Sequence, residues 1–123
     1  MENLIKKLEE LRERFLRTKA LLDIESKIVS EKKLRLKMAA PDFWSDRETA
    51  VSVGQEVEEL ATEIKDWQVM EKEIGEMTEM ASLAQEEATG DLTVELEHKY
   101  EELEKKFSHL EFQLFYFGPL SDF

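Results

Sequence analysis

Apolar residues recur at alternating steps of three and four along most of this chain, and this spacing constrains the fold more than any other feature. Near the C-terminal end the steps are unbroken, at Leu96, Tyr100, Leu103, Phe107, Leu110 and Leu114. Heptad spacing of this kind places apolar side chains on one face of a helix, where they pack against other helices. The sequence therefore predicts an all-α fold in which helices pack through these faces.

The first long stretch, residues 2–40, starts with the same spacing and then loses it. Its first six apolar-face positions are Leu4, Leu8, Leu11, Phe15, Thr18 and Leu22. The next position in this register is Glu25, so the register fails after Leu22. We interpret the change as a phase shift or kink near Asp23, whose carboxylate is able to cap a second helical piece. Both one bent helix and two helices fit this pattern.

A second helix is predicted at 46–86, after a clear interruption. Pro41 disfavours helical backbone at the residue before it. Ser45 and Glu48 have the spacing of a capping box, and Trp44 stands where a hydrophobic staple would. Gly75 is a point at which this helix is able to bend. The heptad positions, with one short step after Trp67, are Val53, Val57, Leu60, Ile64, Trp67, Met70, Ile74, Met77 and Ala81.

The third helix is predicted at 92–117, between a turn at 88–91 and the Gly118-Pro119 pair that ends it. Three helices joined by short connections pack as antiparallel neighbours. We therefore expect residues 1–117 to form a single helical domain. Its architecture would be an elongated antiparallel three-helix bundle, or coiled-coil-like arm, with a thin core.

Charge is unevenly distributed along this acidic chain. The formal net charge is −12, yet residues 1–40 hold 11 basic and 7 acidic residues while residues 41–123 hold 6 basic and 22 acidic ones. This asymmetry favours ion pairing within the chain and makes free nucleic acid a poor default partner. The one basic concentration is a solvated or internally paired face, or else a contact for RNA backbone. Its members are Lys27, Lys32, Lys33, Arg35 and Lys37.

The composition also limits where the protein works. With no cysteine, the chain has no disulfides, thiol nucleophile or thiolate metal site. No apolar run approaches the roughly 20 residues of a membrane span. The N-terminus lacks the apolar centre of a signal peptide. We therefore expect a soluble, cytoplasmic protein that does not contact a membrane.

Nothing in the sequence predicts catalysis or a bound cofactor. The two histidines, His98 and His109, would lie roughly 16 Å apart along one helix and cannot share a metal ion. The many carboxylates fall between the apolar positions, as solvated helix faces do. There is no phosphate-binding glycine loop and no nucleophile elbow. We predict a protein that is not an enzyme and needs no metal or cofactor.

All aromatic residues except Phe123 divide into two groups. Phe15, Trp67, Tyr100 and Phe107 fall on the heptad positions and are predicted to be core residues. If residues 2–40 form a single rod, the others gather at one end of the bundle. They either pack on one another or form a surface that meets another domain. This candidate interaction surface comprises Phe43, Trp44, Phe112, Phe115, Tyr116 and Phe117.

Two short stretches carry a family resemblance. The turn Pro41-Asp42-Phe43-Trp44 follows a helix of this length, and Leu110-Glu111-Phe112 stands near the end of the third helix, before Phe117-Gly118-Pro119. In these stretches and their spacing the chain resembles the N-terminal helical domain of bacterial peptide chain release factor 2. It is similar to release factor 1 only in general helical layout.

The resemblance implies a role in translation termination. In that family the domain reaches toward the stalk base of the large ribosomal subunit, which implies the ribosome and the class II release-factor GTPase as partners. The family's Gly-Gly-Gln and Ser-Pro-Phe motifs are missing, so we expect a non-catalytic fragment in which residues 118–123 begin a linker to absent domains. The aromatic surface would then face those domains, or promote self-association. A stand-alone coiled-coil adaptor is the alternative.

Overall fold

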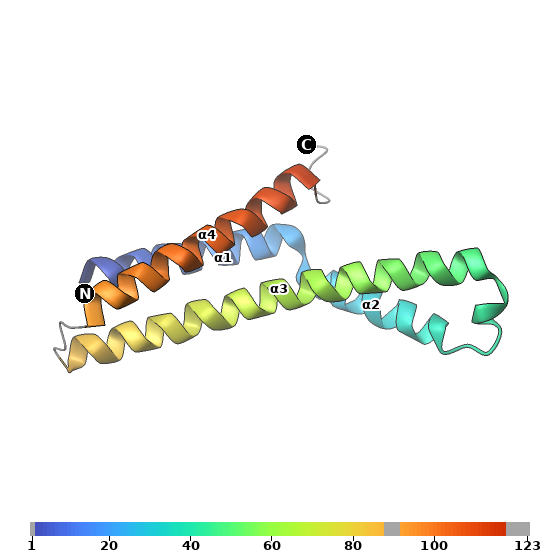
Figure 1. The fold of residues 1–123 in the computed structure, drawn as a ribbon, viewed down its shortest axis with the longest axis horizontal. Coiled ribbons are helices and arrows are strands. Elements are labelled where there is room, and N and C mark those ends of the chain that lie inside the picture. The colour runs from blue at the N-terminus through green and yellow to red at the C-terminus, as the bar shows by residue number, and fades with distance from the viewer. Residues whose placement is uncertain (1, 88–91, 118–123) are drawn as a thin grey trace. The chain divides into compact units, whose positions relative to one another are not determined.

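The computed structural model of this chain describes residues 2–87 and 92–117, and all regular structure in that part is helical (Figure 1). This confirms the predicted all-α fold class. The predicted turn at 88–91 and linker at 118–123 lie outside the described residues. In chain order the elements are α1 (Glu2–Leu22), α2 (Ile24–Met38), the short 3-10 helix η1 (Phe43–Ser45), α3 (Arg47–Glu86) and α4 (Thr93–Phe117).

The helices group into two compact units. The first contains α1, α4 and residues 69–86 of α3; the second is Asp23–Gln68, with α2, η1 and the first half of α3. The two boundaries coincide with the two irregularities in the heptad spacing, after Leu22 and after Trp67. A change of register moves the apolar face around the helix, which is a physical reason for one packing unit to end there. A single domain over residues 1–117 stays a prediction.

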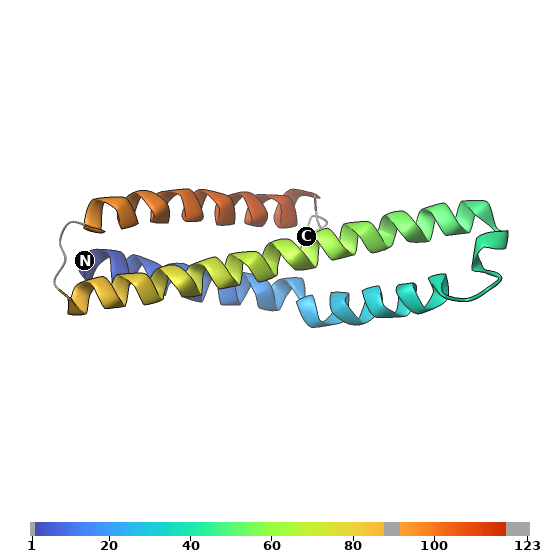
Figure 2. The ribbon, with the colours of Figure 1, turned by 60° about the horizontal axis from the view of Figure 1, so that its bottom comes forward.

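In the first unit α1 and α4 run in the same direction, and α3 runs opposite to both (Figures 1 and 2). Lys7 lies over the ring of Tyr100, and about two turns later Phe15 contacts Phe107, so residue numbers rise together along α1 and α4. The ion pair between Lys106 and Glu73, at 3.7 Å, joins α4 to α3. This order agrees with the antiparallel three-helix packing predicted from the short connections.

The heptad positions form the core of the first unit. All six positions on α1 are buried. Phe15 and Phe107 are among the largest fully buried side chains, and their ring centroids are 5.9 Å apart. Tyr100 is half-buried. The buried residues contributed by α3 and α4 are Met70, Ile74, Met77, Ala81, Ala84, Leu96, Leu103, Phe107 and Leu114.

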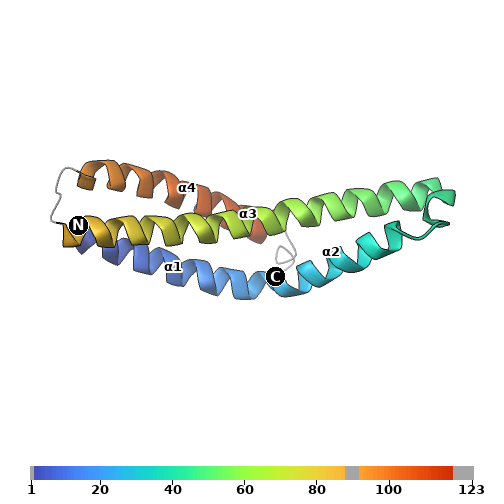
Figure 3. The same cartoon turned by 90° about the horizontal axis from the view of Figure 1, so that it is seen from below.

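The second unit is a helical hairpin in which α2 and residues 47–68 of α3 run antiparallel (Figure 3). Ile24, Val57, Ile64 and Trp67 are buried in it. Lys27 donates to a carboxylate oxygen of Glu63 at 3.0 Å, which pairs the basic first segment with the acidic second one as the charge asymmetry predicted. Helix α2 contributes little to the apolar core of this hairpin, since Ile24 is its buried residue.

Asp23 separates α1 from α2. Its backbone is left-handed, with φ 54° and ψ 62°, a conformation that aspartate tolerates better than most residues because its side chain bonds locally. Its Oδ1 accepts the backbone N–H of Ser26 at 3.4 Å, as an N-cap does. Of the two interpretations of residues 2–40, the structure therefore has two helices, with Asp23 as the cap of the second.

The predicted capping box at Ser45 and Glu48 is wrong, because α3 begins one residue later than that box requires. Asp46 is the N-cap: its Oδ1 accepts the N–H of Thr49 at 3.3 Å, and its Oδ2 accepts the Thr49 hydroxyl at 2.7 Å. These two hydrogen bonds, the hydroxyl's first, lower the pKa of the Asp46 carboxyl. Trp44 is 62% exposed, so it does not serve as a staple.

Candidate functional site and interaction surfaces

The turn between α2 and α3 holds the first pair of candidate aromatic residues. The N–H of Phe43 donates to the carbonyl of Ala40 at 3.1 Å, and the N–H of Ser45 to that of Asp42 at 3.1 Å, which forms η1. The rings of Phe43 and Trp44 meet edge to face, with centroids 5.1 Å apart. Phe43 is half-buried while Trp44 is exposed, so Phe43 supports the indole and Trp44 presents it.

The last turns of α4 present the second group. Phe112 and Tyr116 stack, with centroids 4.5 Å apart and planes at 27°. Phe112, Phe115 and Tyr116 are 48%, 42% and 67% exposed, whereas Leu114 between them is buried. Spacing of three and four puts the three exposed rings on one helix face. The side chain of Phe117 lies outside the described part.

The two aromatic groups belong to different compact units. Phe43 and Trp44 lie in the second unit, and Phe112, Phe115 and Tyr116 in the first. The predicted gathering at one end assumed a single rod over residues 2–40, and that condition does not hold because the helix is divided at Asp23. Each group makes a ring contact of its own. Their role as an interaction surface stays a prediction.

The richest polar cluster surrounds Arg14, between α1 and α4. Its guanidinium donates two hydrogen bonds to Glu111, one from Nε at 2.9 Å and one from Nη2. Nη1 donates to Glu104 at 3.2 Å, and Nη2 also donates to the hydroxyl of Ser108 at 3.0 Å. The hydrogen bond to Glu111 raises the pKa of Arg14 above its usual value. The Ser108 hydroxyl, and then Arg14, lower the pKa of Glu104. These hydrogen bonds join the two helices, because Arg14 stands on α1 and its partners Glu104, Ser108 and Glu111 stand on α4.

Thr18 also belongs to that cluster, and its hydrogen bonds there explain why a polar residue occupies a heptad position. It is the buried polar side chain on α1, and its hydroxyl lies 2.9 Å from the carbonyl of Arg14 and 3.1 Å from Oε2 of Glu111. Sequence reasoning missed the cluster. The available signal was that Arg14, Glu104 and Glu111 each stand next to a heptad position, where interhelical ion pairs form.

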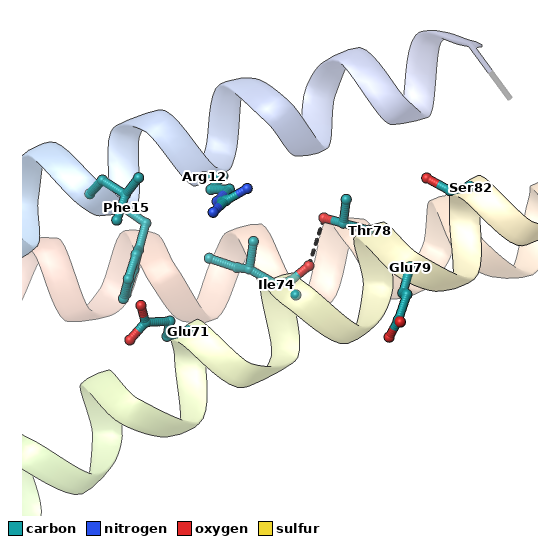
Figure 4. Close-up of a pocket in the computed structure, with 9 residues that line it drawn as sticks. Arg12, Phe15, Glu71, Ile74, Thr78, Glu79 and Ser82 are labelled. Carbon is teal, nitrogen blue, oxygen red and sulfur yellow. Dashed lines mark hydrogen bonds between the residues drawn. The ribbon is translucent and has the colours of Figure 1, made fainter.

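A shallow groove of about 430 Å³ lies between α1 and α3 in the first unit (Figure 4). Phe15 and Ile74 contribute its apolar part, and Arg12 and Glu79 are among its charged groups. Glu71, also in the groove, is paired with Lys19 at 3.2 Å, and the hydroxyl of Thr78 donates to the carbonyl of Ile74 at 2.7 Å. Glu71 and Thr78 are therefore engaged in local bonds, and no hydrogen bond between a nucleophile and a base is found among the described residues of the groove.

The remaining candidate residues lie on the surface. His98 is exposed and lies 3.2 Å from Glu102 on its own helix, and His109 is exposed as well. Across residues 2–87 and 92–117, histidine and carboxylate side chains do not form a group of three that could hold a metal ion. Each helix in the same ranges is too short or too polar to cross a membrane.

These features define a class of protein: a helical domain of coiled-coil type whose surfaces carry exposed aromatic rings and interhelical ion pairs. The sequence matches the PCRF domain model over residues 26–117. The chain therefore belongs to the PCRF domain family.

Relatives of this chain include proteins named peptide chain release factor 2 from three bacterial genera. The protein from Staphylococcus haemolyticus is 30% identical over 112 residues, which are 91% of this chain and 30% of the relative. That from Chloroflexus aggregans is 23% identical over 122 residues, 99% of this chain and 33% of the relative. That from Thermomicrobium roseum is 28% identical over 111 residues, 90% of this chain and 29% of the relative. The chain thus spans about a third of the length of these relatives. No solved structure matches it significantly.

Proposed function

We propose that this chain is the N-terminal accessory domain of a class I peptide chain release factor and acts in translation termination in the cytoplasm. It helps to dock and orient the factor on the ribosome. The observation that carries this proposal is the PCRF domain match over residues 26–117, which includes α3, α4 and all but the first two residues of α2. The relatives named peptide chain release factor 2 support it, since they align with nearly the whole chain.

Docking rather than catalysis is the contribution we assign to the domain. By family resemblance, peptidyl-tRNA hydrolysis requires a Gly-Gly-Gln loop, and none of the four glycines here, Gly54, Gly75, Gly90 and Gly118, is next to another. The polar side chains around Arg14, and Glu71 and Thr78 in the α1–α3 groove, are held in local hydrogen bonds and ion pairs. The domain would work by binding energy alone.

The docking surface we propose is formed by the exposed aromatic residues. Aromatic side chains are enriched at protein interfaces because they bury a large area at a small entropic cost. The exposed residues Trp44, Phe115 and Tyr116 are therefore suited to contact the stalk base of the large subunit, the class II release-factor GTPase or other domains of the factor. Without such partners the same rings would promote self-association at high protein concentration.

Co-sedimentation with purified large ribosomal subunits at low salt tests this proposal. We expect the chain to pellet with the subunits, and Trp44→Ala or Tyr116→Ala to weaken binding at least about tenfold if that ring is a central contact. Val94→Ala is the matched control, since Val94 is an exposed apolar residue outside both aromatic groups. Absence of any subunit binding by the wild-type chain would refute the proposed function. Equal binding by all variants would refute only the aromatic residues as the contact with the large subunit.

A further inference from the structure

The five basic residues of α2 divide into two sets. Lys27 pairs with Glu63 of α3 at 3.0 Å, and Arg35 pairs with Glu31 of its own helix at 3.2 Å. Lys32, Lys33 and Lys37 are exposed, and none of them makes an ion pair with another described residue. Two cations of this helix are therefore used within the hairpin, and three are left to the solvent.

The three unpaired lysines lie on one side of α2. Positions 29, 32, 33, 36 and 37 are spaced by three and four, which places them on the helix surface opposite Ile24 and Leu34. Val29 and Leu36 lie among the lysines and are 50% and 74% exposed. We call Val29, Lys32, Lys33, Leu36 and Lys37 the lysine face.

The lysine face contains no acidic residue although the chain is strongly acidic, and Glu25 lies one turn before Val29 on the same side of α2. Between Ser26 and Pro41 the acidic residue is Glu31, which is held by Arg35. The helix dipole favours cations in the last turn of a helix. That effect accounts for Lys37, but Lys32 and Lys33 lie more than one turn before the end of α2 at Met38. The dipole alone therefore does not explain the face.

We propose that the lysine face binds the phosphate backbone of ribosomal RNA, an inference that rests on the proposed function. The three ammonium groups start from positions spanning about 7.5 Å of helix axis, a length over which an RNA strand presents more than one phosphate. Lysine is depleted from the centres of protein–protein interfaces but is a common phosphate contact. A membrane surface is not the partner we propose, because Val29 and Leu36 alone form too narrow an apolar face for a helix that lies in a membrane surface.

Charge-matched triple variants test this inference. The first, Lys32→Gln/Lys33→Gln/Lys37→Gln, removes the lysine face while keeping good helix formers. The control, Lys6→Gln/Lys65→Gln/Lys105→Gln, removes the same charge from exposed lysines elsewhere on α1, α3 and α4. Circular dichroism is used to check that both triple variants remain folded. Binding is then measured across a salt series to large ribosomal subunits and to protein-free RNA from the same subunits.

We expect the lysine-face variant to bind both targets about tenfold or more weakly than the control. Its slope of log affinity against log salt should be shallower by about 2 to 3, since each of the three lost phosphate contacts removes about 0.7 to 0.9. Subunit binding by the wild type with equal binding by both variants would overturn the inference and leave the proposed function standing. Lysine-dependent binding to protein-free RNA without subunit binding would overturn both, because the inference rests on the proposed function and such binding would be non-specific.

Two further outcomes would overturn the RNA assignment. If the lysine-face variant loses subunit binding while the wild type does not bind protein-free RNA, the face contacts an acidic ribosomal protein instead. If the wild type binds neither target at low salt, both the inference and the proposed function are wrong.

Discussion

Arg14 shows how single charged residues fix the pairing of helices in this protein. Its guanidinium bonds to Glu104, Ser108 and Glu111 of α4 and lies 4.8 Å from the ring centroid of Phe107. The planar guanidinium offers several donors in fixed directions, which a lysine ammonium cannot reproduce. The cluster therefore selects the register between α1 and α4 as well as contributing to their stability.

The pKa of Glu104 gives a prediction about pH. Its value is lowered below the ordinary 4.5, first by the Ser108 hydroxyl and then by Arg14. A carboxyl with a lowered folded-state pKa stabilises the protein above its unfolded-state pKa, and this stabilisation is lost as the pH falls through the folded-state pKa. We therefore expect Glu104→Gln to lower the free energy of unfolding at neutral pH, and this deficit to shrink below pH 4.5.

Urea unfolding at neutral and acidic pH measures that deficit. Glu101→Gln, at an exposed position of the same helix, is the control for the change in net charge. A deficit for Glu104→Gln that stays constant, or grows, as the pH falls would show that the carboxylate does not stabilise the helix pair.

Leu103, which is 3% exposed, tests the core at the level of one side chain. We expect Leu103→Ala to lower the free energy of unfolding by about 2–4 kcal/mol, because it leaves a cavity among side chains that cannot fully collapse. Val94→Ala, at a residue that is 77% exposed, should change it by less than about 0.5 kcal/mol. Similar urea midpoints for the two variants would mean that the heptad face of α4 is not a packed core.

Among the elements, α3 is a 40-residue helix with two glycines in its interior. A Cβ atom added at Gly54 or at Gly75 would meet nothing within 4 Å, so the loss of backbone entropy at glycine is not offset by close packing. The structure also continues the helix through Gly75, where the sequence allowed a bend. These glycines are therefore local weaknesses of α3.

We expect Gly54→Ala and Gly75→Ala each to raise the free energy of unfolding by about 0.5–1 kcal/mol. Thermal unfolding followed by circular dichroism measures both effects. A lower stability for Gly75→Ala, with a gain for Gly54→Ala, would indicate that the groove beside Gly75 is filled in the folded protein in solution.

The start of α3 offers a direct comparison of two caps. Because the Asp46 carboxylate accepts both hydrogen bonds from Thr49, we expect Asp46→Ala to lower the melting temperature and Ser45→Ala to leave it nearly unchanged. Asp46→Asn should keep most of the stability, since an amide oxygen also accepts at an N-cap. The reverse order of Ser45→Ala and Asp46→Ala would restore the capping box predicted from the sequence.

The helices and their buried faces could be predicted from the sequence, because heptad spacing depends only on helix geometry. The N-cap of α3 could not be predicted, since Ser45 and Asp46 are adjacent and both residue types are good N-caps. Nor could the spacing decide between one helix and two at Asp23, because it records a change of register but not the left-handed backbone there. The aromatic groups were predicted residue by residue, but their common location depended on the undivided rod.

For the whole molecule, spectroscopy tests whether residues 1–117 unfold as one domain or as two. Both tryptophans, Trp44 and Trp67, belong to the second compact unit, so their fluorescence reports on that unit alone. Circular dichroism reports on the helices of both units. We expect the two signals to change together during urea unfolding, as in a two-state transition, because α3 contributes residues to both units. Separate transitions for the two signals would mean that the two units are distinct domains, contrary to the prediction of a single one.

The central proposal is that this chain acts as a release-factor domain that binds the ribosome without catalysing peptide release. The most direct measurement is peptide release from ribosomes stalled at a stop codon, driven by full-length release factor 2, with increasing amounts of this chain added. The account predicts that the chain releases no peptide alone and progressively inhibits the full-length factor by competing for its docking site. Peptide release by the chain itself, or unchanged activity of the factor at a large excess of the chain, would contradict it.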